Sequence, residues 1–216
     1  HLQRRRQRQM CIRDSLFAVM AGHDALVQSM AQLRRLAVTL LTIANDIRLL
    51  ACGPRAGLGE LLLPANEPGS SIMPGKVNPT QCEAMAMVCT QVIGMDAAVA
   101  AAGAGGHLQM NVYKPLIGFN LIEGIRLLQD ACRCFRLNLV TGMEADRDRI
   151  AFYVERSLML VTALTPEIGY EKACAIAQHA HRDGLTLREA AMQSGAITGE
   201  RFDQLIDPAA MASPHR

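Results

Sequence analysis

Apolar residues recur at intervals of three and four between residues 17 and 52, a spacing that places them on one face of an α-helix. Polar side chains such as Gln28 and Arg35 occupy the opposite face, and Gly53 with Pro54 ends the pattern. A helix of about 35 residues is roughly 50 Å long. Because this exceeds the length of most globular helices, the pattern predicts a helical bundle. The apolar positions are Leu26, Val27, Met30, Leu33, Leu36, Ala37, Leu40, Leu41, Ala44, Ile47 and Leu50.

Two more long helices are predicted, over residues 80–102 and 111–139. The first is rich in alanine and apolar nearly all round its axis, which predicts that protein surrounds it on every side. A glycine–alanine break at 103–106 separates the two, and Pro115 fits the first turn of the second. Three such helices carry more apolar surface than one short chain can bury, so we expect self-association in a shared bundle.

Beyond Thr141 the pattern changes to short helices separated by polar residues, which indicates a small separate domain. One helix is predicted over 165–181, a capping box at Thr186 and Glu189 opens the next, and 198–206 forms the last. No strand-like alternation of useful length occurs, so the fold class is all-α. The expected parts are 1–16, artefactual or disordered; 17–140, part of a central long-helix bundle; and 141–216, a small helical C-terminal domain.

The composition agrees with a helical globular protein, because 50% of the residues are hydrophobic, only 4% are aromatic and tryptophan is absent. The net charge of +2 comes from the first 15 residues, whose five arginines and one aspartate give 5 − 1 = +4, leaving 2 − 4 = −2 for the rest. Residues 5–15 read like the translation of a sequencing-library adaptor, so we exclude them from fold reasoning. No nucleic-acid partner is expected, since aromatic residues do not interleave with these arginines.

Neither a membrane nor a metal is expected as a partner. Charged and amide side chains within 34–48 interrupt every twenty-residue apolar window of the first helix. The seven cysteines lack the paired spacing of a zinc site and read as reduced thiols. His179 and His181 lie on different faces of a predicted helix, which argues against a shared metal ion.

The segment with the most specialised residues is 66–83, with the sequence Asn-Glu-Pro-Gly-Ser-Ser-Ile-Met-Pro-Gly-Lys-Val-Asn-Pro-Thr-Gln-Cys-Glu. Its prolines and glycines restrict or free the backbone, which is typical of a functional loop. Ser70 and Ser71 follow a glycine, so successive backbone N–H groups can point to one side and stabilise an anion. Lys76 adds a cation, Asn78 adds a donor, and the helix predicted after them adds the positive end of its dipole. Each residue singly is also an ordinary surface-turn residue, but together they indicate a loop that binds an anionic substrate.

Residues 69–79 resemble the signature loop of the fumarase/aspartase superfamily. Within it, Gly-Lys-Val at 75–77 fits the fumarase and aspartase branch, and Thr-Gln-Cys-Glu at 80–83 favours the class II fumarases. The resemblance covers about residues 17–211, through the segments 44–48, 53–55, 64–83, 111–112, 157–164 and 184–187.

The resemblance implies reversible hydration of fumarate to L-malate, with a small dicarboxylate as substrate and with no metal and no other cofactor. It implies that Ser70 is the base that removes or returns the C3 proton of L-malate. Glu83 would orient and polarise a catalytic histidine on another segment, although a first-turn helix acid is also favoured by the dipole alone. The residues implied to hold the substrate carboxylates are Ser71, Lys76, Val77 and Asn78.

The family also forms homotetramers in which each active site draws on three subunits. Three other segments of that site, a Ser-Gly-Thr, a Ser-Ser-Asn and a Thr-His-Leu-Gln stretch, have no convincing counterpart in this chain. We therefore interpret the chain as a C-terminal fragment and expect it to be inactive alone. The lack of a credible signal segment favours the cytoplasm. Two alternatives stay open, namely aspartate ammonia-lyase of the same superfamily and a non-catalytic helical scaffold.

Overall fold

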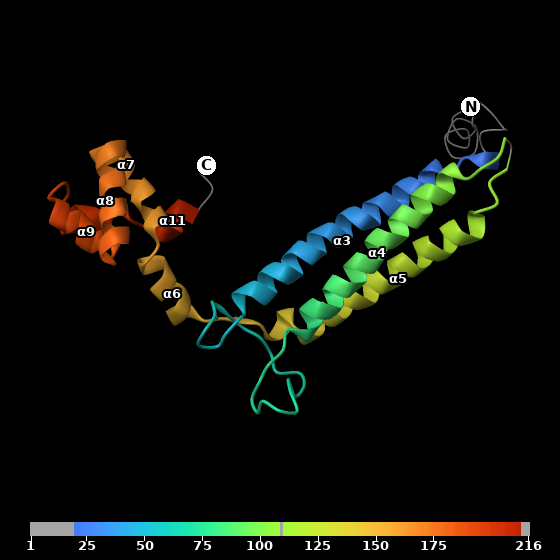
Figure 1. Cartoon of the computed structure of the whole chain (residues 1–216), viewed down its shortest axis with the longest axis horizontal. Coiled ribbons are helices and arrows are strands. Elements are labelled where there is room, and N and C mark those ends of the chain that lie inside the picture. Colours follow the sequence, from blue (N-terminus) through green and yellow to red (C-terminus); the bar gives the residue numbers. More distant parts are fainter. Residues whose placement is uncertain (1–19, 109, 213–216) are drawn as a thin grey trace, which may run out of the picture. The chain divides into compact units, whose positions relative to one another are not determined.

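A computed structural model describes residues 20–108 and 110–212 of the chain (Figure 1). Helices dominate these residues, so the all-α prediction is confirmed. The segment 1–16, which includes the adaptor-like string, lies outside the described residues.

Two short strands occur among the described residues. The strand β1 (Leu61–Leu62) pairs with β2 (Glu144–Ala145), and each is two residues long. The chain divides into two compact units between Glu144 and Ala145. Each unit is described by itself.

The first unit is built on three long helices, α3 (Asp24–Leu50), α4 (Thr80–Ala104) and α5 (Lys114–Asn138), which lie side by side in Figure 1. Helix α4 contacts both α3 and α5, whereas α3 and α5 contact each other less. A short 3-10 helix, η1 (Val140–Gly142), follows α5. The helical bundle predicted from the apolar spacing is therefore present.

The long helix predicted from about residue 17 is interrupted in the described residues, and residues 17–19 of that prediction lie outside them. Gly22 and His23 interrupt the helical backbone, and the regular helix begins at Asp24. The acidic side chain of Asp24 in the first turn suits the positive end of the helix dipole. Apolar spacing continues through this break, which is why the sequence pattern did not reveal it.

The start of α5 lies at Lys114 rather than at Asn111, because the Asn111 side chain holds the connection to α4. Its Nδ2 donates to the carbonyl oxygen of Ala102 at 2.8 Å, and its Oδ1 accepts from the backbone N–H of Tyr113 at 2.8 Å. Asn111 is fully buried, so these bonds satisfy polar atoms that would otherwise be costly to bury. The Asn111 side chain and the backbone hydrogen bonds between His107 and Met110 together hold the connection between the two helices.

In the bundle core, the buried residues of α3 recur every seven residues. Helix α3 contributes Met30, Ala37 and Ala44, which are seven residues apart and completely buried. The small side chains of the two alanines allow the α3 and α4 backbones to approach closely, and the repeat is that of coiled-coil packing. The buried residues of α4 are Cys82, Met85, Cys89, Val92, Met95, Val99 and Ala102.

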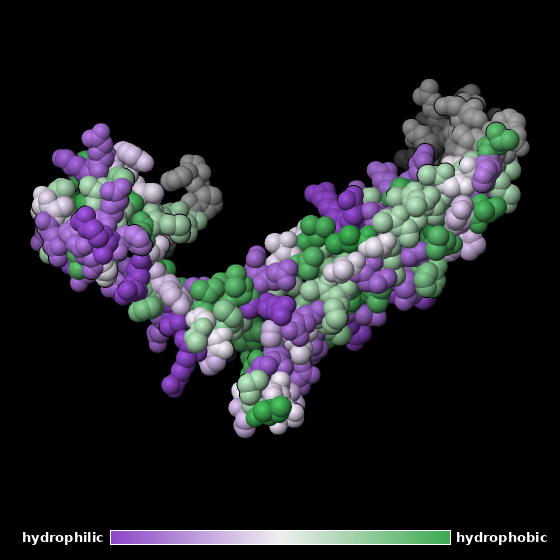
Figure 2. Space-filling model, viewed as in Figure 1, coloured by the Kyte–Doolittle hydropathy of each residue, from purple (hydrophilic) through white to green (hydrophobic). Residues whose placement is uncertain are grey.

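Much apolar surface on the long helices stays exposed, as the green residues along them show in Figure 2. The outer face of α4 carries Met87, whose relative exposure is 68%. Within this chain, α3 and α5 therefore leave part of α4 exposed, and its enclosure by further copies in a shared bundle stays a prediction. The other exposed apolar residues of α3 and α5 include Leu36, Val38, Ile43, Leu49, Leu116, Phe119, Ile122 and Ile125.

In the described part of the chain, α4 is also long and apolar enough to cross a membrane, judged by length and composition alone. The central helix of a water-soluble bundle meets the same two criteria.

The second unit consists of short helices around its own core. The helices are α6 (Arg147–Glu155), the 3-10 helix η2 (Leu158–Leu164), α7 (Thr165–Ile168), α8 (Tyr170–Asp183), α9 (Leu187–Ser194), α10 (Gly199–Leu205) and α11 (Pro208–Ala212). Its buried residues are Leu164, Ala173, Ile176, Ala180, Leu187, Ala190, Ala191 and Phe202.

The capping box at Thr186 and Glu189 is confirmed, because both of its hydrogen bonds are present at the start of α9. The single helix predicted over 165–181 is wrong. Gly169, with a φ of +84°, ends α7 and starts α8 in a backbone conformation that other residues adopt only at a cost.

Two arginine–carboxylate pairs link helices of the second unit. Arg188 donates to Asp203 through Nε at 2.8 Å and Nη2 at 2.9 Å, and Arg201 donates to Glu167 through Nε at 3.2 Å and Nη2 at 2.8 Å. These hydrogen bonds, together with the arginine charges, lower the pKa of Asp203 and the pKa of Glu167. The paired carboxylates therefore favour the folded unit only while they are ionised.

The stability of the second unit should fall in acid because of these pairs. A carboxylate with a lowered folded-state pKa stabilises the fold above its unfolded pKa of about 4, and that stability is lost as the pH falls through the folded pKa. We expect Asp203→Asn and Glu167→Gln each to make the decline of the urea midpoint below about pH 5 shallower. The control is Glu200→Gln, which removes an exposed carboxylate of α10 that forms no salt bridge within the described residues. Equal acid dependence in all variants would contradict this assignment.

Candidate functional site

The predicted signature segment forms a loop at 66–79, termed the serine loop, followed by the first turn of α4. The loop projects from the long helices in Figure 1. Its start is anchored by Asn66, whose Nδ2 donates to the carbonyl oxygen of Asn138 at 2.6 Å, at the end of α5. Both ends of the loop are therefore attached to the helical bundle.

The serine loop narrows where Gly69 meets the backbone of Lys76 and Val77, a contact termed the neck. A Cβ atom on residue 69 would lie 2.6 Å from the carbonyl carbon of Lys76 and 3.2 Å from the nitrogen of Val77. Side-chain atoms do not approach a backbone so closely, so only glycine fits there. On the same side, the Asn78 Nδ2 donates to the carbonyl oxygen of Gly69.

Ser70 follows the neck, and its hydroxyl accepts two backbone hydrogen bonds. The N–H groups of Ile72 and Met73 both donate to Ser70 Oγ at 3.1 Å. Ser70 is half-buried. Two converging N–H dipoles at one oxygen favour a negative charge on it, as in an oxyanion hole.

Three of the predicted substrate ligands lie on the exposed side of the loop. Ser71, Lys76 and Val77 are exposed, and Lys76 forms no salt bridge among the described residues. Gly75, with a φ of +77°, makes the turn that places Lys76, whose N–H donates to the carbonyl oxygen of Met73 at 3.3 Å. The cation is thus presented to solvent by a defined turn.

Glu83 lies apart from Ser70, in the first turn of α4, and pairs with a helix that sequence reasoning did not connect to it. Its Oε1 is 3.3 Å from an Nη of Arg48 near the end of α3. Both side chains are about half exposed, so the pair adds little stability. It does restrict where the carboxylate lies.

The structure therefore brings some predicted residues together and leaves others separate. Asn78 and Ser70 meet at the neck, because the Asn78 Nδ2 donates to the carbonyl oxygen of Gly69, the residue before Ser70. Sequence reasoning missed the roles of Gly69 and Arg48. The glycine before the two serines could have signalled the first, whereas nothing in the local sequence links Arg48 with Glu83.

Cys82 is the nucleophilic side chain nearest in sequence to Glu83, but it does not suit catalysis. Burial raises the pKa of the Cys82 thiol, and the charge of Arg48 opposes this only in part. A buried thiol with a raised pKa is a poor nucleophile, so it is a core residue. Among the residues that the structure describes, no three His, Cys, Asp or Glu side chains gather into a metal site.

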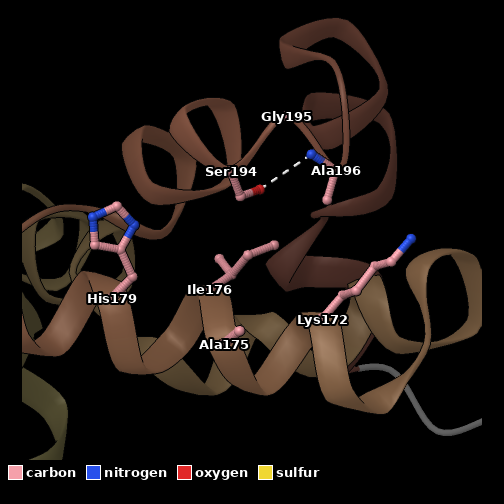
Figure 3. Close-up of a pocket in the computed structure, with 7 residues that line it drawn as sticks. All are labelled: Lys172, Ala175, Ile176, His179, Ser194, Gly195 and Ala196. Atoms are coloured by element: carbon pink, nitrogen blue, oxygen red, sulfur yellow. Dashed lines mark hydrogen bonds between the residues drawn. The ribbon is translucent and has the colours of Figure 1, made fainter.

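A pocket of about 540 Å³ lies in the second unit, between α8 and the end of α9 (Figure 3). His179 Nε2 is 3.0 Å from Asp183 Oδ2, and the Ser194 Oγ accepts from the N–H of Ala196 at 3.2 Å. Lys172 points away from His179 in Figure 3. None of the six residues predicted for the site lines this pocket.

Comparison with known proteins finds family matches in both units of the chain. The profile of the Lyase family matches residues 6–94, which include the serine loop, and the profile described as Fumarase C C-terminus matches residues 160–213. The chain belongs to the fumarase/aspartase family of lyases. The first match overlaps the string 5–15, whose interpretation as an adaptor remains a prediction.

Named relatives from distant organisms support the same family. A protein named class II fumarate hydratase from Parasynechococcus marenigrum is 97% identical over 203 residues, which are 94% of this chain and 44% of that protein. The mitochondrial fumarate hydratase 1 of Arabidopsis thaliana is 53% identical over 201 residues, 93% of this chain and 41% of that protein. The chain therefore spans less than half the length of these relatives.

The fold is shared with a solved structure. The crystal structure of a recombinant class II fumarase from Schistosoma mansoni matches with a TM-score of 0.89 and 44% identity, over 100% of this chain and 47% of that one. Family membership and fold are therefore shown by sequence and structure together.

The neck should open when residue 69 gains a side chain. In Gly69→Ala the added methyl group meets the Lys76 carbonyl, and backbone must move to admit it. We expect trypsin to cleave after Lys76 faster than in the unmodified chain, without loss of helical circular dichroism. The control is Gly94→Ala on α4, where the added methyl group meets nothing within 4 Å. Unchanged cleavage in Gly69→Ala would show that the neck is not closed in solution.

Proposed function

We propose that this chain carries the serine loop of a class II fumarate hydratase, which hydrates fumarate reversibly to L-malate. The observation that carries the proposal is the pair of backbone N–H groups on Ser70 Oγ, in a loop that belongs to a lyase family. The named relatives are fumarate hydratases, which supports this reaction over others of the superfamily.

The proposed base is Ser70. In the dehydration direction, the C3–H bond of L-malate breaks, the proton moves to Ser70 Oγ, and the electron pair is held in the neighbouring carboxylate as an aci-carboxylate. The electron pair then returns to form the C2–C3 double bond of fumarate, the C2–O bond breaks, and the hydroxyl leaves as water by taking a proton from a general acid outside the serine loop. An ordinary serine hydroxyl is far too weak an acid to be ionised, so the N–H groups of Ile72 and Met73, with the positive charge of Lys76 in the same loop, would stabilise the alkoxide.

The substrate carboxylates would bind on the exposed side of the loop. Ser71 offers a hydroxyl, Lys76 a cation, and Val77 and Asn78 further polar groups, and exposure leaves all but Asn78 open to a ligand. The start of α4 at Thr80 adds positive potential there. This arrangement suits a small dicarboxylate and uses no metal or other cofactor.

The proposed role of Glu83 is to orient a catalytic histidine from a segment other than those described. A carboxylate that accepts from one imidazole nitrogen selects the tautomer and raises the basicity of the other. The contact with Arg48 would keep Glu83 in position until that histidine is in place.

We further propose that the protein acts as a homotetramer in the cytoplasm. The exposed apolar residues on α3, α4 and α5 support self-association, because an isolated chain would leave them in water. The cytoplasmic location follows the bacterial relatives, although the Arabidopsis relative is named as mitochondrial.

The test is a chimera in which the 203 aligned residues of this chain replace their counterparts in the Parasynechococcus marenigrum protein. We expect it to convert fumarate to malate at a rate similar to that relative, measured by loss of fumarate absorbance. The same assay on the chain alone gives the background rate of fumarate loss. Formation of aspartate from fumarate and ammonium, without malate, would favour aspartate ammonia-lyase instead. An inert chimera beside an active relative would favour a scaffold.

The proposed base is tested by Ser70→Ala in the same chimera. Loss of the base should lower kcat about a hundredfold or more. Ser157→Ala is the matched control, since Ser157 lies outside the serine loop, at the start of η2. A Ser70→Ala chimera with full activity would refute the assignment.

A further inference from the structure

Arg48 and Glu83 form a salt bridge between the first two long helices. Arg48 lies in the last turn of α3 and Glu83 in the first turn of α4, and Arg48 Nη2 is 3.3 Å from Glu83 Oε1. Helix packing holds both backbones, because Ala44, one turn before Arg48, and Cys82, next to Glu83, are buried. The two side chains therefore start from defined positions and meet across the helix interface.

The geometry of this pair differs from that of the arginine–carboxylate pairs in the second unit. There, Arg188 and Arg201 each donate two hydrogen bonds to one carboxylate, at 2.8–3.2 Å. The contact of Arg48 with Glu83 is longer, and within the described residues the Glu83 carboxylate has no other polar partner. Because an ionised carboxylate has about four acceptor positions, most of the acceptor capacity of Glu83 stays open.

Arg48 limits the directions in which the Glu83 carboxylate can point. The Glu83 side chain is 42% exposed, and three torsions separate its carboxylate from the backbone. Without a partner it would exchange among many rotamers. The positive charge of Arg48 favours the rotamers that keep the carboxylate at the helix interface. Glu83 is thus restrained while its open acceptor positions stay available to another donor.

We propose that Arg48 is a positioning residue, which restrains the Glu83 carboxylate and leaves its open acceptor positions to the catalytic histidine. The proposal rests on the function proposed above, in which that histidine comes from another segment. In this role Arg48 touches neither the substrate nor the reacting atoms. The competing assignment makes Arg48 a ligand of a substrate carboxylate, since its side chain is 53% exposed.

The two assignments predict different kinetics in the chimera. If Arg48 acts through Glu83, Arg48→Met should lower kcat about tenfold, because the carboxylate loses its restraint. The KM for L-malate and the inhibition constant of succinate, a dicarboxylate that does not react, should change less than about threefold. A larger rise in the succinate constant would make Arg48 a carboxylate ligand and overturn the positioning role.

The dependence on Glu83 is tested by a double-mutant cycle. Glu83→Gln alone should lower kcat about a hundredfold, because it removes the carboxylate proposed to orient the histidine. Adding Arg48→Met to Glu83→Gln should lower kcat less than about twofold further, because no carboxylate remains for Arg48 to restrain. A further tenfold loss in the double variant would show that Arg48 acts independently of Glu83 and would overturn the proposal.

The matched control is Arg34→Met. Arg34 also lies on α3, and its Nε is 2.9 Å from Oδ2 of Asp96 on α4. This variant breaks a salt bridge between the same two helices, about 20 Å further along α4 than Glu83. Its kcat should equal that of the unmodified chimera. An equal loss in Arg34→Met and Arg48→Met would mean that general loosening of the helix interface explains both, and the proposal would be wrong.

A second variant, Arg48→Lys, decides the matter if Arg48→Met fails to fold. A lysine ammonium supplies the same positive charge on a long flexible stem, which is enough for a contact made through one nitrogen. This variant should therefore keep at least about a third of kcat. A tenfold loss in Arg48→Lys, with unchanged helical circular dichroism, would overturn the proposal.

The variants also separate this proposal from the proposed function. If Ser70→Ala and Glu83→Gln abolish turnover while Arg48→Met changes nothing, only the role of Arg48 fails. If Glu83→Gln keeps full activity while Ser70→Ala does not, the roles of Glu83 and Arg48 both fail and the proposed base stands. Full activity of Ser70→Ala would overturn the proposed function, and this inference with it.

Discussion

The packing of α4 against α3 is the contact on which the first unit depends. Ala37 and Ala44 of α3 carry no side chain beyond Cβ and are completely buried. Because the two helix backbones lie close together, the start of α4 at Thr80 has a defined position relative to the end of α3. The serine loop ends where α4 begins. The packing of α4 against α3 therefore sets the position of the C-terminal end of the loop.

The proposed functional side chains thus lie on a loop whose two ends are attached to the helical bundle. Asn66 fixes the entry of the loop to the end of α5, and α4 fixes its exit. The salt bridge between Arg48 and Glu83 joins the same two helices, α3 and α4. The packing of these helices therefore sets the positions of both the serine loop and Glu83. This arrangement is common in enzymes, in which residues on loops act with precision because the scaffold beneath them does not move.

The sequence predicted best the features that depend on residues close together in the chain. The helices followed from apolar spacing, and the cap at Thr186 and Glu189 followed from two side chains three residues apart. The break at Gly169 was missed, because apolar residues continue across it and only the backbone reveals the positive φ. The neck at Gly69 and the partner of Arg48 depend on residues that meet only after folding. The serine loop was therefore identified from its composition, whereas its internal hydrogen bonds required the structure.

The two donors on Ser70 carry a further consequence, which concerns the electron pairs of the oxygen. A neutral hydroxyl has two lone pairs, and the N–H groups of Ile72 and Met73 occupy both. A neutral Ser70 therefore has no electron pair left with which to take a proton from carbon. Only loss of its own proton provides a third pair, directed away from the two amides. In this geometry the same two bonds that favour the alkoxide also prevent the uncharged serine from acting as a base, so the proton must leave Ser70 before the substrate carbon can react.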